Sequence, residues 1–185
     1  SDLEGYEETL NRMRQILQPN HKVLEIGCGT GATALELAGG VAQYTGTDVS
    51  AAMIDIARNR ITDNAPTNLT FKVAPADQAP DGDFDVVLAL NLLHLVEDLD
   101  TVLARVFAAL PKGGYLISKT SLLGAAPWYV RAVIPVMRAV GKAPFVASLS
   151  EKQVIDAQNA AGFEIDETFT QPGLVPRLFA VMRKV

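Results

Sequence analysis

The residues best suited to chemistry lie in a glycine-rich segment, residues 25–31, which reads E-I-G-C-G-T-G. Glycines at this spacing allow a sharp turn and let a ligand approach main-chain atoms with no Cβ in the way. Asp48 follows about 20 residues after Gly27, where a carboxylate can accept hydrogen bonds from ribose hydroxyls. The segment also satisfies the dinucleotide-binding pattern G-x-G-x-x-A, which ends at Ala32. The spacing alone predicts a nucleotide-containing ligand and leaves its identity open.

A carboxylate beside the glycine turn separates the possible ligands. Glu25 lies two residues before the first glycine, and we expect its side chain to point into the loop beside the ligand. There it would repel a pyrophosphate and attract an ammonium or sulfonium group. The acid followed by G-x-G-x-G therefore favours a ligand that carries positive charge.

Histidine and cysteine offer few further chemical options. His94 lies beside the expected cleft, where it can act as a base, cap a helix or pair with Glu97 or Asp98. Cys28 is the only cysteine, which excludes an intrachain disulfide and a Cys-based zinc site, and we expect it to be a small packed residue. No Ser/His/Asp set and no paired carboxylates are recognisable. We therefore predict no metal site and name His94 as the single catalytic candidate.

The elements that must position these residues alternate between strand and helix. Apolar runs predict strands at KVLEIG, YTGTD, LTFKVA, FDVVLAL and YLISKT, and helical periodicity predicts helices between them. Runs such as VVLAL are apolar at every position, as in a parallel sheet covered by helices on both faces. A helix that begins with a capping box at Ser150 and Gln153 precedes two closing strands, FEIDETFT and RLFAVMRK. We predict a doubly wound, Rossmann-like α/β sandwich with a mostly parallel seven-stranded sheet and an antiparallel C-terminal strand.

The helix after Asp48 is expected to begin at a Ser50 cap, which leaves the carboxylate of Asp48 available for a ligand. Its apolar residues Met53, Ile56, Ala57 and Ile61 are predicted to share one face. A methionine on such a stripe is either part of the core or part of a ligand site.

Composition restricts the class of protein. The chain has 185 residues, of which 49% are hydrophobic and 20% charged, as expected for a single globular domain, residues 1–185. A net charge of −5 argues against a nucleic-acid-binding surface, which needs clustered Lys and Arg. No apolar stretch is long enough to span a membrane, and no signal peptide is visible. We expect a cytoplasmic monomer or homodimer that acts on a small molecule.

Four segments resemble, in order, the motifs of the class I methyltransferases that depend on S-adenosylmethionine. They are VLEIGCGTG, TGTDVSAAMI, FDVVLALNLLHLVED and LPKGGYLISKT. The resemblance implies S-adenosylmethionine as cofactor and methyl transfer as reaction. In open α/β sheets such ligands bind in the crevice at the carboxyl ends of the strands.

The resemblance assigns cofactor binding to Glu25, Gly27, Cys28, Gly29, Gly31, Asp48, Val49, Met53, Ala76, Asp77 and Asn91. The glycines would pack against the methionine part, and Glu25 would orient the loop or reach the cofactor's amino group through water. Asp48 would bind both ribose hydroxyls, and Met53 would cover one face of the adenine. Asn91 would offer its carbonyl near the amino acid end.

One position departs from the family pattern. Members often have an acid followed by alanine after the third strand, whereas this chain has Pro75 and Ala76. Proline has no side-chain acceptor for the adenine amino group. Ala76 and Asp77 are therefore expected at the adenine edge, with Asp77 in the role of the acid.

Residues 121–149 are predicted to form a helical lid insertion over an apolar acceptor. Val130, Val133, Met137 and Val140 would share an apolar face, with basic residues roughly opposite. The alternatives for this segment are an extra packed helix and a helix on an anionic membrane surface.

Two alternative functions remain open for the chain as a whole, a NAD-dependent oxidoreductase and a non-catalytic cofactor-binding module, since both would share the sheet and Asp48.

Overall fold

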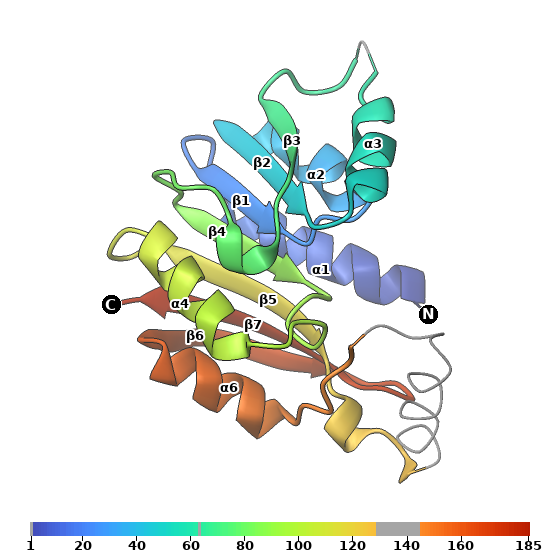
Figure 1. The fold of residues 1–185 in the computed structure, drawn as a ribbon, viewed down its shortest axis with the longest axis vertical. Coiled ribbons are helices and arrows are strands. Elements are labelled where there is room, and N and C mark those ends of the chain that lie inside the picture. Colours follow the sequence, from blue (N-terminus) through green and yellow to red (C-terminus); the bar gives the residue numbers. More distant parts are fainter. Residues whose placement is uncertain (1, 63, 129–144) are drawn as a thin grey trace.

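The computed structural model describes residues 2–62, 64–128 and 145–185. Its seven strands form one sheet in the order β3-β2-β1-β4-β5-β7-β6 (Figure 1). The strands are β1 Lys22–Ile26, β2 Gln43–Asp48, β3 Leu69–Val73, β4 Val86–Leu90, β5 Tyr115–Ser121, β6 Phe163–Gln171 and β7 Arg177–Lys184. Strands β1 to β5 pair in parallel, and β7 pairs antiparallel with both β5 and β6. The predicted fold class is confirmed, including the single antiparallel strand near the C-terminal end.

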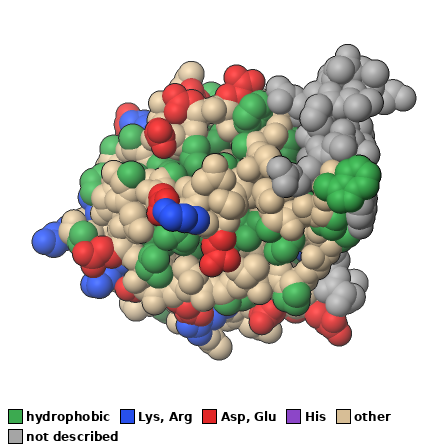
Figure 2. Space-filling view, turned by 90° about the horizontal axis from the view of Figure 1, so that it is seen from below, with side chains coloured by type: hydrophobic (Ala, Val, Ile, Leu, Met, Phe, Trp, Pro, Cys, Tyr) green, Lys and Arg blue, Asp and Glu red, His purple; other side chains and the backbone are tan. Residues whose placement is uncertain are grey.

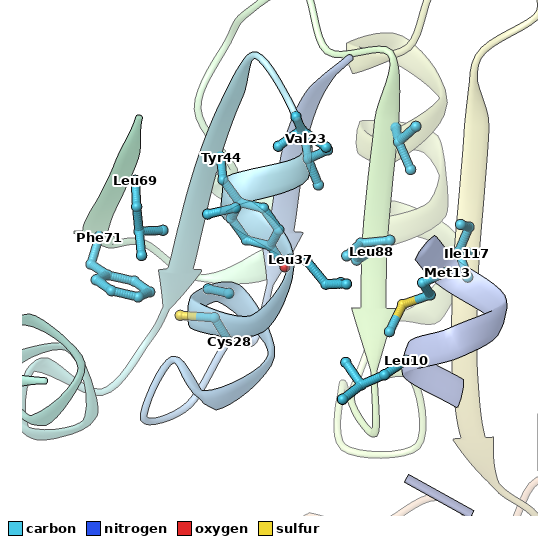
Figure 3. Packing of buried hydrophobic residues seen from close by; sticks show 14 of the residues in the cluster. Leu10, Met13, Val23, Cys28, Leu37, Tyr44, Leu69, Phe71, Leu88 and Ile117 are labelled. Carbon is cyan, nitrogen blue, oxygen red and sulfur yellow. The ribbon is translucent and has the colours of Figure 1, made fainter. Parts of the chain in front are cut away.

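Helices cover both faces of the sheet, as the continuously apolar strands require. The helices are α1 Asp2–Ile16, α2 Ala32–Leu37, α3 Ala51–Asn59, α4 Leu99–Ala109 and α6 Glu151–Ala160, with short 3₁₀ turns η1 Ala38–Gly40, η2 Ala76–Gln78 and η3 Leu123–Ala125. Buried side chains of α1, α2 and α3 share one core layer, and those of α4 and α6 share the other. In the first layer, Leu10 and Met13 of α1 pack toward Leu88 and Ile117 of the sheet (Figure 3).

Successive residues of β1 enter different layers. Val23 belongs to the core under α1 and α2, and Leu24 belongs to the core under α4. This follows from the two-residue period of a strand, which sends alternate side chains to opposite faces. The same alternation decides where Glu25 points.

The predicted apolar face of α3 is confirmed at Ala57 and wrong at Met53, Ile56 and Ile61. Ile54 and Ala57 are fully buried at 0% exposure, whereas Met53 is 41% and Ile56 46% exposed. Both pairs have the three-residue spacing of one helix face, so the sequence pattern alone does not choose between them. Packing onto β2 and β3 selects Ile54 and Ala57. The predicted cap is confirmed, since Ser50 Oγ accepts a hydrogen bond from the Met53 amide.

The expected lid falls mostly outside the described residues, because residues 129–144 are not among them. Its two flanks are described and pack on the domain. The Gly124 amide donates to the Leu149 carbonyl at 2.9 Å, and the Ala147 amide donates to the His94 carbonyl at 2.8 Å. The predicted capping box is present, with Ser150 and Gln153 bonded reciprocally.

The described surface has two features that bear on partners. Across the described ranges, no helix is long and apolar enough to cross a membrane. The face over α6 and β6, seen from below, carries interspersed acidic, basic and apolar side chains with no continuous basic patch among the atoms drawn in colour (Figure 2).

Candidate functional site

A cleft of about 530 Å³ opens at the carboxyl ends of the parallel strands. Its lining comes from the segments that follow β1, β2, β3 and β4, so four separate parts of the chain meet there. The lining residues are Gly27, Asp48, Val49, Ala74, Pro75, Ala76, Asp77, Leu92, Val96, Glu97, Asp98 and Val102. This is the position in which open α/β sheets bind ligands.

The glycine loop leaves β1 in a conformation that excludes most side chains. Gly27, Gly29 and Gly31 have φ angles of 69°, 53° and 73°, a left-handed region that costs other residues about 1–2 kcal/mol each. A Cβ on Gly27 would lie 2.7 Å from Leu92, and one on Gly31 would lie 2.5 Å from Phe71. The loop therefore needs glycine both for its conformation and for its close packing.

Asp48 connects the end of β2 to the glycine loop. Its Oδ2 accepts a hydrogen bond from the Gly29 amide and its Oδ1 accepts one from the Ser50 amide, both at 2.9 Å. Each carboxylate oxygen has a second lone pair for a ligand donor. Asp48 therefore holds the loop in place and also faces the cleft.

Glu25 lies beneath the loop. It is 3% exposed, and the Tyr44 hydroxyl donates a hydrogen bond to its Oε2 at 2.8 Å. Burial raises the pKa of Glu25 to about 7, although the bond from Tyr44 opposes the change. The sequence led us to expect the Glu25 side chain in the loop beside the ligand, and the structure does not place it there. The alternation along β1 directs it instead to the core layer that holds Val23. Glu25 is not among the described residues that line the cleft.

Cys28 packs as the sequence predicts. It is a buried residue of the core layer that also holds Leu37 and Tyr44 (Figure 3). Its amide donates to the Thr47 carbonyl at 2.8 Å, which ties the loop to β2. Burial raises the pKa of its thiol, so the reactive thiolate is disfavoured.

The residues expected around the adenine lie partly in the cleft. Val49, Ala76 and Asp77 line it, the last two from the 3₁₀ turn η2 that Pro75 precedes. Met53 is exposed on the first turn of α3 and is not among the described lining residues.

Asn91 directly follows β4 and has a φ of 56°. Its amide donates to the Lys119 carbonyl at 2.7 Å, which extends the pairing between β4 and β5 by one residue. Its side chain is exposed, and Asn91 is absent from the described lining of the cleft. The left-handed backbone marks it as the residue at which the chain turns away from the sheet.

One wall of the cleft was not predicted. It consists of Leu92, Val96 and Val102, which are apolar residues of the lining. Leu92 and Val96 flank a turn in which the Leu95 amide donates to the Leu92 carbonyl at 2.7 Å, so no helix or strand period marked them in the sequence.

Two acids that were not assigned to cofactor binding also line this cleft, Glu97 and Asp98. Asp98 caps α4, because its Oδ1 accepts from the Thr101 amide at 2.9 Å and its Oδ2 accepts from the Thr101 hydroxyl at 2.6 Å. These bonds from Thr101 lower the pKa of Asp98. Its charge therefore persists at the mouth of the cleft over a wide pH range.

His94 is a buried residue of the segment that follows β4. It is 8% exposed and is not among the described lining residues. Its buried Nδ1 has no hydrogen-bond partner among the described residues, and burial lowers its pKa. The imidazole is therefore neutral at pH 7 and has a free acceptor nitrogen if Nδ1 is unprotonated.

Comparison with known proteins agrees with this geometry. The family model described as a methyltransferase domain matches residues 23–114, about half of the chain. A hybrid PKS-NRPS synthetase of Fusarium sp. is 37% identical over 109 aligned residues, which cover 54% of this chain and 3% of the synthetase. The chain thus corresponds to a small part of that relative.

Solved structures share the fold at low sequence identity. A SAM-dependent methyltransferase from Methanosarcina mazei superposes with a TM-score of 0.77 at 22% identity, covering 94% of this chain and 96% of its own. Magnesium protoporphyrin IX methyltransferase from Synechocystis, solved with bound SAH, gives 0.74 at 20% identity, with 97% and 84% covered. At such identities these likenesses establish the fold.

Together with the glycine loop and Asp48, the family match identifies the class: the chain belongs to the class I S-adenosylmethionine-dependent methyltransferases. S-adenosylmethionine is the cofactor of this domain, and methyl transfer is its type of reaction. The alternative of a NAD-dependent oxidoreductase is not favoured.

Proposed function

We propose that this domain transfers the methyl group of S-adenosylmethionine to a small, largely apolar acceptor. The observation that carries the proposal is Asp48, whose carboxylate faces the cleft and is fixed by the amides of Gly29 and Ser50. A ribose needs such an oriented acceptor, and an adenine needs an apolar wall like that of Leu92 and Val96. The residues present therefore fit the cofactor.

Within this proposal the other predicted residues have distinct tasks. Gly27, Gly29 and Gly31 leave room for the methionine part, and Asp77 accepts from the adenine amino group. Glu25 acts from beneath the loop, where it orients the backbone. Met53 and Asn91 stay predicted contacts at the two ends of the cofactor.

When bound, the cofactor supplies a methyl group on a sulfonium, which is already a good leaving group. The protein's main contribution is to hold the acceptor in line with that methyl carbon and to exclude water. Such positioning supplies on the order of 7–11 kcal/mol in favourable model systems. A base is needed only for an acceptor that must lose a proton, and His94, neutral and buried, is the candidate for that task.

The acceptor and the setting of the domain belong to the same proposal. The names of the matched relatives, highly reducing polyketide synthases among them, support a carbon-rich acceptor for this chain. We propose that residues 1–185 act as one domain and that residues 121–149 close over the acceptor. The single buried cysteine supports a cytoplasmic location, and the acidic composition argues against nucleic-acid partners.

Ligand-dependent stabilisation tests the proposal. S-adenosylhomocysteine at about one hundred times its dissociation constant should raise the free energy of unfolding by about 2.7 kcal/mol, and NAD should not. Stabilisation by NAD alone would instead indicate a dinucleotide enzyme. Binding of S-adenosylmethionine without turnover across a broad acceptor screen would indicate a non-catalytic cofactor-binding module.

A further inference from the structure

Carboxylates line the cofactor cleft at four positions, and two of them have no hydrogen-bond partner among the described residues. Asp48 accepts hydrogen bonds from two backbone amides, and Asp98 caps α4. Asp77 and Glu97 also line the cleft, and neither side chain has a hydrogen bond or an ion pair with another described residue. The proposed function assigns the adenine amino group to Asp77 and leaves Glu97 without a role.

The described lining of the cleft offers no cation to these two carboxylates, since it contains no Lys, Arg or His. Arg105 of α4 lies nearby but is directed elsewhere. Its guanidinium donates to the Ala79 carbonyl at 2.7 and 3.1 Å and to Asp81 Oδ1 at 2.7 Å. Asp77 and Glu97 are both exposed, so a ligand that donates hydrogen bonds to them replaces water.

The segments that carry the two acids are fixed relative to each other. Asp77 lies in η2, and Glu97 directly precedes the N-cap of α4. The bonds from Arg105 to the Ala79 carbonyl join α4 to the residue that ends η2. The backbone at both acids is therefore in place before a ligand enters, which lowers the entropy lost on binding.

An adenine amino group has two N–H donors, so two acceptors can bind it at once. With each bond at about 2.9 Å, the two acceptor oxygens lie about 5 Å apart. Pro75, at the position where the family often has an acid, has no side-chain acceptor to offer. A purine with a carbonyl in place of the amino group would present an acceptor to the carboxylates, and this arrangement is repulsive.

We propose that Glu97 is a specificity-determining residue, whose carboxylate accepts one N–H of the adenine amino group while Asp77 accepts the other. The cleft thereby selects a 6-aminopurine over a 6-oxopurine, although the two bases have nearly the same size. The segment between β4 and α4 thus supplies an acceptor that the position after β3 lacks. The inference rests on the proposed function for the role of Asp77.

Titration calorimetry of the full chain with three ligands of equal charge tests the proposal. They are S-adenosylhomocysteine, its deamino analogue with hydrogen in place of the amino group, and S-inosylhomocysteine, which has a carbonyl there. Each bond to a carboxylate contributes about tenfold in affinity. The parent should therefore bind the deamino analogue about one hundredfold more weakly than S-adenosylhomocysteine. In Glu97→Ala this ratio should fall to about tenfold.

The conservative variant Glu97→Gln has a signature of its own. The amide keeps an acceptor oxygen for the adenine amino group and gains an N–H donor for a carbonyl. S-inosylhomocysteine should bind Glu97→Gln at least about tenfold more tightly than it binds the parent, because repulsion is replaced by a hydrogen bond. The affinity for S-adenosylhomocysteine should change less than about threefold, since a neutral acceptor replaces a charged one.

Asp100→Ala is the matched control. Asp100 is an exposed acid in the first turn of α4 and is not among the described lining residues. Its removal changes the net charge as Glu97→Ala does, and the ratio of the two affinities should stay at the parent value.

The contrary results are distinct. An unchanged ratio in Glu97→Ala overturns the proposed contact, and an equal change in Asp100→Ala attributes the effect to charge alone and also overturns it. Equal binding of the three ligands to the parent does the same. The proposed function fails on another readout, the absence of methyl transfer in an acceptor screen, whereas the ratios are measured without an acceptor. Failure of S-adenosylhomocysteine to bind the parent overturns both.

Discussion

The buried carboxylate of Glu25 predicts an unusual dependence of stability on pH. Among the described residues its side chain accepts one hydrogen bond, from the hydroxyl of Tyr44, and it has little contact with water. Glu25→Gln keeps the shape and the acceptor oxygen for Tyr44 while it removes the possibility of charge. The substitution therefore isolates the cost of ionising this group in the core.

The size and sign of the effect follow from the two pKa values. Burial raises the pKa of Glu25 from 4.5 to about 7 in the folded state. Between these values the folded protein binds a proton that the unfolded chain has lost, so stability falls as pH rises. Each pH unit in this window contributes about 1.36 kcal/mol, which amounts to about 3 kcal/mol. The loss of folding stability that Glu25 causes is complete above about pH 7 and absent below about pH 4.

Urea unfolding of both proteins at a series of pH values measures this contribution. Glu25→Gln should match the parent near pH 4 and exceed its free energy of unfolding by about 3 kcal/mol at pH 8. Glu7→Gln is the control, because Glu7 is exposed on α1, and it should leave the pH dependence unchanged. A constant difference between Glu25→Gln and the parent at every pH would refute the reasoning.

Further predictions concern the loop and its ligand. Asp48→Ala should weaken binding of S-adenosylhomocysteine at least about tenfold, because a hydrogen bond to a charged group contributes about 1.5–3 kcal/mol. Titration calorimetry measures this affinity, and His94→Ala should leave it within about twofold of the parent value. Equal losses in the two variants would remove Asp48 from the ribose site. Gly31→Ala should destabilise the fold by more than about 2 kcal/mol in urea, since its Cβ would lie 2.5 Å from the Phe71 ring in a left-handed conformation. Gly29→Ala, with the same strain but no atom within 4 Å, should cost only about 1–2 kcal/mol; equal costs would show that the close approach to Phe71 is unimportant.

The sheet was predictable because its signals are local. Strands buried on both faces must be apolar at nearly every position, and this separates runs such as VVLAL from the amphipathic helices between them. Caps at Ser50 and Ser150 mark helix starts through hydrogen bonds that reach only three residues along the chain. The position of Asp48 in the cleft follows from the same logic, since it ends a parallel strand.

What the sequence did not predict depends on contacts between distant segments. The buried face of α3 is decided by its packing on β2 and β3, because the stripes through Met53 and Ile54 have equal spacing. The direction of Glu25 depends on which layer receives the odd residues of β1, and no residue of β1 itself decides that. The wall of Leu92 and Val96 depends on how the chain turns after β4. Predicting any of these three features requires knowing which other element packs against the segment concerned.

The place of β7 between β5 and β6 has a consequence for the order in which the domain is made. β6 precedes β7 along the chain, yet its only strand partner in the described sheet is β7. A ribosome therefore delivers β6 before the strand that can receive it, and the five parallel strands are complete while the outer edge of β5 is still unpaired. Such an edge invites pairing with other chains. Arrival of residues 177–184 closes it and recruits β6 in the same event, so truncation within this segment should release both strands and leave nascent chains prone to aggregation.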